Sequence, residues 1–388
     1  MRLQRKIHID SLGLLCRGAL IERQKMNVVS IIMLVFALLG ALDRIFGNKL
    51  GIGKEFEKGF LLLGQLVLSM MGMIIIAPVL AELLSPAFDF VYNVFGIEPS
   101  IIPASLFAND MGGAPLAKEI AKNSQVGMYN AMIVSSMMGA TISFTIPLAL
   151  GCLKKEKHKE LILGLLSGIV TIPVGCLVAG FICKIPFLAL IFDLLPLIIF
   201  AAIIAVGLLL VPNVCIKIFN VLGALIKIII TVGLVLGMIE LLLGIKPIAS
   251  AAPATEGALI CLNAAVVMAG AFPLLFMLSK LLSKPMELLG KALKIEKQST
   301  LGFVSTLANN VSTFEMMNDM DKKGTVLNSA FAVSASFVLA DHLAFTLAFE
   351  PSYLLSMTLG KIVAGISAIL FALVIYKKVG KKISGDEA

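Results

Sequence analysis

Long apolar runs follow one another along most of the chain, and short polar stretches separate them. Nine of these runs hold about 20 residues each, the length at which an α-helix crosses a hydrocarbon core of roughly 30 Å. Helices satisfy all their own backbone hydrogen bonds there. The pattern therefore predicts an all-α polytopic membrane protein with about nine transmembrane helices, over residues 28–46, 60–81, 127–150, 160–183, 187–211, 219–243, 257–279, 325–348 and 353–376.

Two further stretches, 101–121 and 299–320, are apolar in their first half and polar in their second. This change predicts two re-entrant hairpins or broken helices. The positive-inside rule tests the choice, because a hairpin returns the chain to the side from which it entered. A full span at 101–121 would place the basic cluster at 154–159 outside. With hairpins and a cytoplasmic C-terminus, the only basic residues outside, after Met26, are Lys118, Lys122, Lys184 and Lys246.

The first 25 residues do not fit this arrangement. They carry six basic residues, and their apolar run is too short and interrupted for a signal-peptide core. The hairpin topology would place these charges on the outer side, which the positive-inside rule disfavours. We therefore predict that residues 1–25 are a disordered extension or follow from a mis-assigned start, with Met26 as the true start.

Composition agrees with lipid as the main solvent, because 59% of the residues are hydrophobic, 14% are charged and the mean hydropathy is +1.00. The net charge of +8 comes from short clusters between apolar runs, which indicate topology and not a nucleic-acid surface. The six Cys residues lack C-x-x-C or C-x-x-H spacing, so we expect neither disulfides nor a metal site. No nucleotide-binding or hydrolase motif is present, which predicts a protein that is not an enzyme and has no cofactor.

The chain matches itself when it is shifted by about 200 residues. Ser105, Ala108 and Asn109 then fall on Ser305, Ala308 and Asn309. Corresponding helices are separated by an odd number of crossings, so the two halves have opposite orientations. This predicts an inverted repeat with a first transmembrane unit at 26–183, a linker helix at 187–211, a second unit at 215–377 and a cytoplasmic tail at 378–388.

Polar residues inside the apolar regions are the candidate site. Broken helices of inverted repeats meet near the bilayer midplane and form the solute site there. An ionisable group in hydrocarbon costs roughly 2.5 to 3.5 kcal/mol, so each needs a partner or a purpose. Glycines let the backbone break and approach a ligand closely. The predicted substrate-binding residues are Asn109, Asp110, Gly112, Gly113, Asn309, Asn310, Asp341 and His342.

Structural roles are the alternative for each of them. Asp110 could cap a helix end or pair with Lys118, and the asparagines could hydrogen-bond neighbouring helices. Asp341 and His342 are expected side by side on the eighth helix, about 100° apart, so that at least one faces inward. Glu315 is expected nearer the interface than the centre, and Lys227 and Lys361 are expected to snorkel or to pair with a carboxylate.

Short motifs in both halves carry a family resemblance. They include FEKGF at 56–60, DMGG at 110–113, GIVTIP at 168–173, TLANN at 306–310 and DHL at 341–343. From about Met26 to the C-terminal helix they resemble the ethanolamine utilisation permease family, EutH. The resemblance implies uptake of ethanolamine across the bacterial cytoplasmic (inner) membrane, for breakdown by ethanolamine ammonia-lyase, often within a microcompartment.

Two other functions stay open beside this one. The first is a cation- or proton-coupled transporter of another small amine or amino acid, in which Asp341 and His342 carry protons. The second is a membrane scaffold or sensor that transports nothing. Facilitated diffusion and ion coupling, transport of charged or neutral ethanolamine, and a homo-oligomeric state are open as well.

Overall fold

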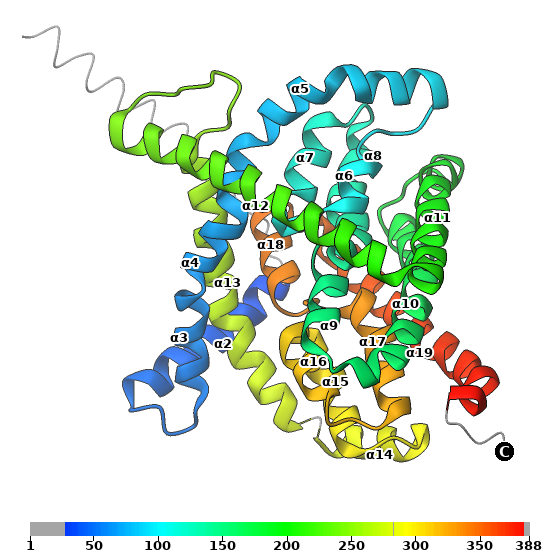
Figure 1. The fold of residues 1–388 in the computed structure, drawn as a ribbon. Coiled ribbons are helices and arrows are strands. Elements are labelled where there is room, and N and C mark those ends of the chain that lie inside the picture. Colours follow the sequence, from blue (N-terminus) through cyan, green and yellow to red (C-terminus); the bar gives the residue numbers. More distant parts are fainter. Residues whose placement is uncertain (1–27, 282, 384–388) are drawn as a thin grey trace, which may run out of the picture.

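The computed structural model describes residues 28–281 and 283–383, which form helices and connecting segments without strands (Figure 1). The predictions for residues 1–25 and for the last residues of the tail lie outside this range. The α-helices are α2 (Val28–Ile45), α3 (Ile52–Leu61), α4 (Leu63–Leu66), α5 (Gly72–Phe95), α6 (Ile101–Leu106), α7 (Gly113–Ile120), α8 (Ser124–Tyr129), α9 (Ile146–Cys152), α10 (His158–Ile182), α11 (Phe187–Leu210), α12 (Pro212–Leu243), α13 (Ala254–Leu281), α14 (Ser283–Leu293), α15 (Lys297–Ala308), α16 (Asn310–Met317), α17 (Lys322–Ala335), α18 (Asp341–Phe349) and α19 (Leu354–Ile383). Shorter segments are the π-helical η1 (Val67–Met71), η3 (Asn130–Gly139) and η4 (Thr141–Thr145), and the 3-10 turns η2 (Asn109–Met111), η5 (Lys155–Lys157) and η6 (Pro351–Tyr353).

Eight helical stretches within the described ranges are long and apolar enough to cross a membrane. They coincide with eight of the nine predicted segments, so the prediction of an all-helical, multi-pass membrane protein is confirmed. Several are longer than the apolar runs suggested. The stretch Ile52–Phe95, for example, joins α3, α4, η1 and α5 through irregular turns.

The prediction of the eighth helix, over 325–348, was wrong. Helix α17 ends at Ala335, and α18 begins only at Asp341. Between them, the N–H groups of Phe337 and Leu339 donate to the carbonyls of Thr306 and Leu307, at 3.2 and 3.0 Å. These carbonyls lie in the last turn of α15, where they have no partner within their own helix. The N–H groups at the break therefore bond to the end of α15 and not to the preceding turn of α17. A uniformly apolar run cannot reveal that change of partner.

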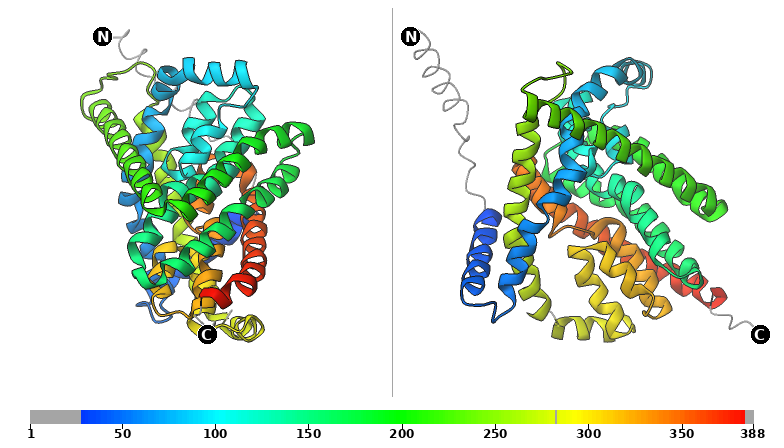
Figure 2. Two further views of the ribbon diagram at one scale, coloured as in Figure 1. Left: turned by 45° about the vertical axis from the view of Figure 1, so that its right-hand side comes forward. Right: turned by 60° about the vertical axis from the view of Figure 1, so that its left-hand side comes forward.

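The helices pack into two assemblies. The wall helices are α2, α3, α4, η1, α5, α12 and α13, which contact one another. The hairpin bundle comprises α6, α7, α15 and α16 together with η3, α10, α17 and α19, whereas α18 packs mainly against α13 and also touches α19. In Figure 2 the blue α2 and α3 stand beside the yellow-green α13, apart from the green α10 and the red α19. Small residues allow this close packing: Gly59 of α3 lies against the backbone of Ala269 in α13.

The two stretches at 101–121 and 299–320 each fold as a pair of short helices whose outer ends are tied together. In the first, Glu98 before α6 accepts hydrogen bonds from the N–H groups of Lys122 and Asn123 after α7, at 2.9 and 3.0 Å. In the second, Asp321 after α16 accepts from Ser299 in α15 at 2.5 Å. Both segments are therefore helical hairpins, and their tips lie inside the molecule.

Candidate solute site

The first hairpin tip holds Asp110. Helix α6 gives way to extended backbone at Phe107, η2 follows, and α7 begins after Gly112. The N–H of Ala108 donates to Ser143 Oγ at 3.1 Å, which anchors the tip to η4. Gly112 has φ +108° and its Cα lies against the side chain of Met73, so both the backbone conformation and the space favour glycine.

The second hairpin tip holds the asparagine pair. Asn309 is in extended backbone between α15 and α16, and its Oδ1 accepts from the N–H of Val311 at 2.7 Å. Its side chain therefore caps α16. Asn310 is buried, and its Nδ2 donates to Thr145 Oγ1 at 3.1 Å. This contact joins the second hairpin to η4, the same segment that anchors the first.

The break in the eighth predicted helix positions Asp341 and His342. They occupy the first turn of α18, a separate short helix, so the expectation that they share a long eighth helix was wrong. His342 Nε2 lies 4.0 Å from Asp110 Oδ1, and His342 is buried, with 2% exposure. The half-buried Asp341 lines the same cavity as Asp110 and His342. Both residues therefore line the cavity from the first turn of a helix that begins at the break.

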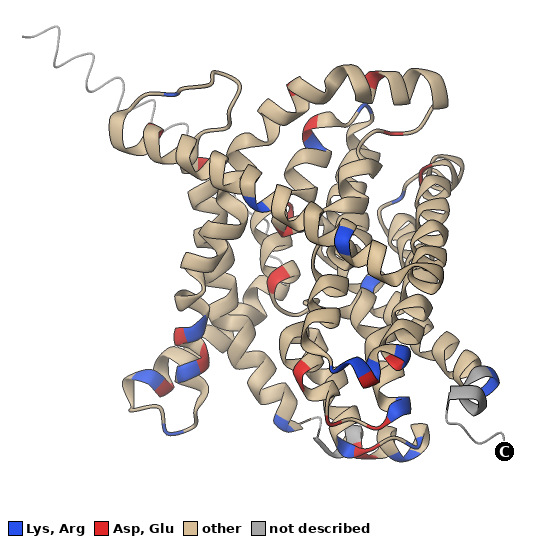
Figure 3. Ribbon diagram, in the orientation of Figure 1, with Lys and Arg blue, Asp and Glu red and all other residues tan. Residues whose placement is uncertain are grey.

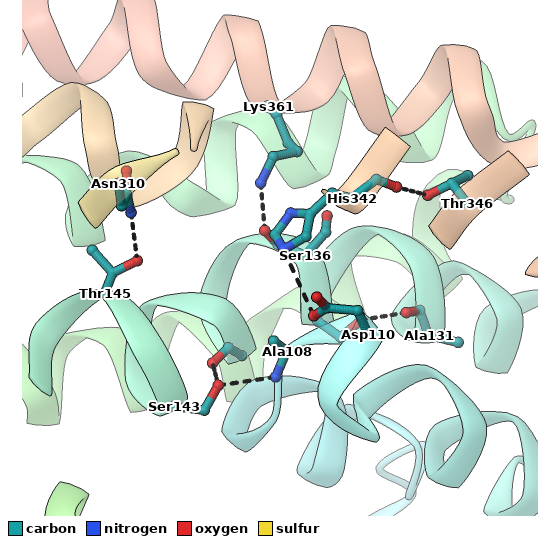
Figure 4. A network of polar contacts seen from close by, with 12 residues as sticks. Ala108, Asp110, Ala131, Ser136, Ser143, Thr145, Asn310, His342, Thr346 and Lys361 are labelled. Carbon is teal, nitrogen blue, oxygen red and sulfur yellow. Dashed lines mark hydrogen bonds and ion pairs between the residues drawn. The ribbon is translucent and has the colours of Figure 1, made fainter. Parts of the chain in front are cut away.

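Lys361 is a member of this cluster that sequence reasoning did not select. It lies in α19, is completely buried, and donates to the main-chain oxygen of Ser136 in η3 at 2.5 Å. Figure 4 shows its side chain reaching toward the His342 ring, with Asp110 on the other side of that ring. The signal was present in the sequence, because Lys361 is the one cation inside the apolar run 353–376.

A cavity of about 560 Å³ lies where the wall helices meet the hairpin bundle. On the bundle side it is lined by the two hairpin tips and the break before α18, and on the wall side by one face of α3, α4 and η1. Two aromatic rings, Phe144 and Phe337, pack edge to face in its lining with their centroids 5.5 Å apart. Gln65 and Ser69 add neutral polar groups from the wall. Carboxylates, aromatic faces and amides together suit a small polar cation.

The predicted site residues fall into two sets. Asp110, Asn309, Asp341 and His342 line the cavity. The others stand behind that lining: Gly112 and Gly113 form the turn that carries Asp110, and Asn310 bonds Thr145. Asn109 is buried, and neither its Nδ2 nor its Oδ1 has a hydrogen-bond partner among the described residues.

The described ranges contain neither a cluster of side chains suited to a metal ion nor a disulfide. No group of three or more His, Cys, Asp and Glu side chains there could hold a metal ion. The five cysteines in those ranges, Cys152, Cys176, Cys183, Cys215 and Cys261, are free. The sixth, Cys16, lies outside them.

The fold and the cavity define a multi-pass α-helical membrane protein with a site between two helix assemblies that combines charged, polar and apolar residues. Residues 26–375 match the family described as "Ethanolamine utilisation protein, EutH", and the chain belongs to this family, as its motifs predicted.

Three curated relatives match this chain over nearly their whole length. The chain is 43% identical to the "Probable ethanolamine permease EutH" of Listeria monocytogenes, over 93% of this chain and 97% of the relative. It is 36% identical to the proteins of the same name in Salmonella typhimurium and Escherichia coli, over 91% and 93% of this chain and 96% and 98% of the relatives. No solved structure matches the chain.

Proposed function

We propose that this protein carries ethanolamine across the bacterial cytoplasmic membrane through the cavity at the hairpin tips. The observation that carries the proposal is the presence of two carboxylates, Asp110 and Asp341, in the lining of one internal cavity of a multi-pass membrane protein. An unpaired carboxylate inside a membrane protein is unfavourable in free energy, and a bound ammonium group would offset that cost. The printed names of the relatives point to the same substrate.

The lining matches both ends of protonated ethanolamine. The ammonium group would lie between the carboxylates of Asp110 and Asp341 and against the faces of Phe144 and Phe337. The hydroxyl both donates and accepts, which suits the amide of Asn309. Four heavy atoms at a ceiling of about 1.5 kcal/mol each limit binding to about 6 kcal/mol, or a Kd of tens of micromolar. Such weak binding permits rapid release.

An inverted repeat would supply the alternating access. The two hairpins correspond at a shift of about 200 residues, and each half also contributes helices to both assemblies, with α5 and α10 from the first and α12 and α19 from the second. In this proposal residues 26–183 and 215–377 are the units, and α11 is the linker near 187–211. Movement of the hairpin bundle against the wall helices would then expose the site to each side in turn.

The charge distribution supports an orientation. Lys and Arg residues gather at the end of the molecule where α3 and α14 lie (Figure 3), and the positive-inside rule assigns such an end to the cytoplasm. On the wall helices, the residues that line the cavity lie along one helical face, from Ser69 in η1 to Lys58 in α3. In this orientation the cavity extends from the hairpin tips toward the cytoplasm.

A second candidate is uptake coupled to protons. It is favoured by one observation, the 4.0 Å approach of His342 Nε2 to Asp110 Oδ1 beside the proposed ammonium position. One bridging water, or a small movement that closes this gap, would allow a histidine and a carboxylate so placed to exchange a proton. The two candidates share the site and differ in whether a proton gradient drives accumulation.

Uptake of labelled ethanolamine into proteoliposomes tests both candidates. We expect saturable uptake that excess unlabelled ethanolamine suppresses and that propylamine, which lacks the hydroxyl, suppresses less. Equilibration without a gradient identifies facilitated diffusion, whereas accumulation only with an imposed proton or sodium gradient identifies coupling. Absence of saturable uptake by correctly inserted protein would overturn the proposed function.

A further inference from the structure

Among the residues that the structure describes, no carboxylate forms an ion pair with the buried ammonium of Lys361. Its one hydrogen bond among the described residues goes to the main-chain oxygen of Ser136, at 2.5 Å. Lys361 is completely buried and is not part of the cavity lining. A substrate in the cavity therefore does not touch it. A buried, charged group that makes no contact with the ligand acts on the ligand through its field.

The titratable groups near Lys361 come from three elements. His342 of α18 lies between the Lys361 ammonium and Asp110 of the first hairpin tip (Figure 4). Asp341 adjoins His342 in the cavity lining. On the other side, Cys176 of α10 is the remaining titratable group near the ammonium. The imidazole of His342 is neutral in this proposal, because the Lys361 ammonium would repel a second positive charge. The buried thiol of Cys176 is neutral as well.

The remaining charge near the cavity is already paired. Lys58 lines the outer part of the cavity, and its Nζ lies 2.6 Å from Glu55 Oε1. With both carboxylates ionised, the inner site contains two negative charges and one fixed ammonium, which leave one negative charge. Among buried groups, neutrality is strongly favoured over a net charge of either sign.

We propose that Lys361 is the fixed countercharge of the ethanolamine site and restricts the site to one monovalent cation at a time. This inference rests on the proposed function and adds a rule of selectivity to it. With Lys361 present, an organic monocation such as ethanolammonium neutralises the site, whereas a dication of the same size leaves an excess positive charge. Ethylenediamine is the matched probe, because it replaces only the hydroxyl of ethanolamine by a second amine.

The measured quantity is the ratio of ethylenediamine uptake to ethanolamine uptake in proteoliposomes, at neutral pH, where a large fraction of the diamine carries two charges. The wild-type protein is expected to prefer ethanolamine. Lys361→Gln leaves two negative charges, so the ratio is expected to move toward the diamine by about tenfold or more. Lys361→Arg keeps the charge and is expected to keep the wild-type preference.

A compensating variant separates charge from architecture. Lys361→Gln combined with Asp341→Asn again leaves one negative charge, so we expect its ratio to return toward the wild-type value even if both rates are lower. A purely structural role of Lys361 would lower both rates and leave the ratio unchanged. Should Lys361→Gln fail to reach the membrane, the double variant is expected to recover its membrane level.

The outcomes are distinguishable from failure of the proposed function. If the wild-type protein takes up no ethanolamine, the proposed function fails. The countercharge is then tested on the purified protein, where the thermal stabilisation by ethylenediamine relative to that by ethanolamine replaces the ratio of uptakes. If the wild-type protein does take it up, an unchanged ratio in Lys361→Gln overturns the countercharge. A double variant that keeps the diamine preference, or fails to recover its membrane level, overturns it as well.

Discussion

The Nε2 atom of His342 lies 4.0 Å from the Oδ1 atom of Asp110, although the two residues belong to opposite halves of the chain. Asp110 is carried by the tip of the first hairpin and His342 by the helix that begins after the break at 336–340. Both positions are interruptions of helical structure. The chain therefore brings its ionisable groups together at the points where its backbone is irregular, as in transporters whose broken helices form the solute site.

Removing one carboxylate charge from the cavity should impair transport without unfolding the protein. We expect Asp110→Asn and Asp341→Asn each to slow ethanolamine uptake by about 10- to 100-fold, since a hydrogen bond to a charged group contributes roughly 1.5 to 3 kcal/mol. Uptake is compared at matched membrane levels. The control is Glu256→Gln, an exposed carboxylate at the start of α13. Normal uptake by both aspartate variants would remove them from the site.

The turn after Asp110 should not accept a side chain. Gly112→Ala places a Cβ against Met73 at φ +108°, and a cost of about 1 to 3 kcal/mol is expected. We expect a lower melting temperature in detergent and slower uptake. Gly223→Ala in α12 is the matched control, because nothing lies within 4 Å of its added Cβ. Equal melting temperatures for the two variants would contradict the strained turn.

The tie at the base of the second hairpin should stabilise the protein. Asp321 accepts from Ser299 and from the N–H of Gly324 at 3.1 Å, so it joins α15 to the start of α17. We expect Asp321→Ala to cost about 1 to 2 kcal/mol, as loss of an N-cap does. The exposed Asp319→Ala, two residues earlier, is expected to change stability by less than about 0.5 kcal/mol. Thermal unfolding of the two purified variants measures the difference.

The wall side of the cavity should be reachable by a small cation. In a cysteine-free background, Ser69→Cys is expected to react with an aminoethyl thiol reagent applied from the cytoplasmic side, because Ser69 lines the cavity. Ethanolamine should slow this labelling, since it occupies the same space. Ser279→Cys, an exposed position beside Lys280 at the end of α13 and outside the cavity lining, should be labelled without such protection. Equal protection at both positions would argue against a shared space.

Much of this protein could be predicted from the order of its residues. Apolar runs about 20 residues long identify membrane helices because lipid enforces one simple rule on each segment by itself. Polar residues such as Asp110 and Asn309 stood out for the same reason, and both line the cavity. The family motifs are local as well, so the match over residues 26–375 followed from short strings.

The tertiary structure alone decided where helices break and which residues meet. The break at 336–340 exists because Thr306 and Leu307 offer carbonyls to its N–H groups, and that exchange depends on a hairpin elsewhere in the chain. Lys361 belongs to the charged cluster because α19 packs against η3, which places its ammonium at the carbonyl of Ser136. Hydropathy depends on each segment separately, whereas hydrogen bonds and fields between distant segments depend on their positions in space.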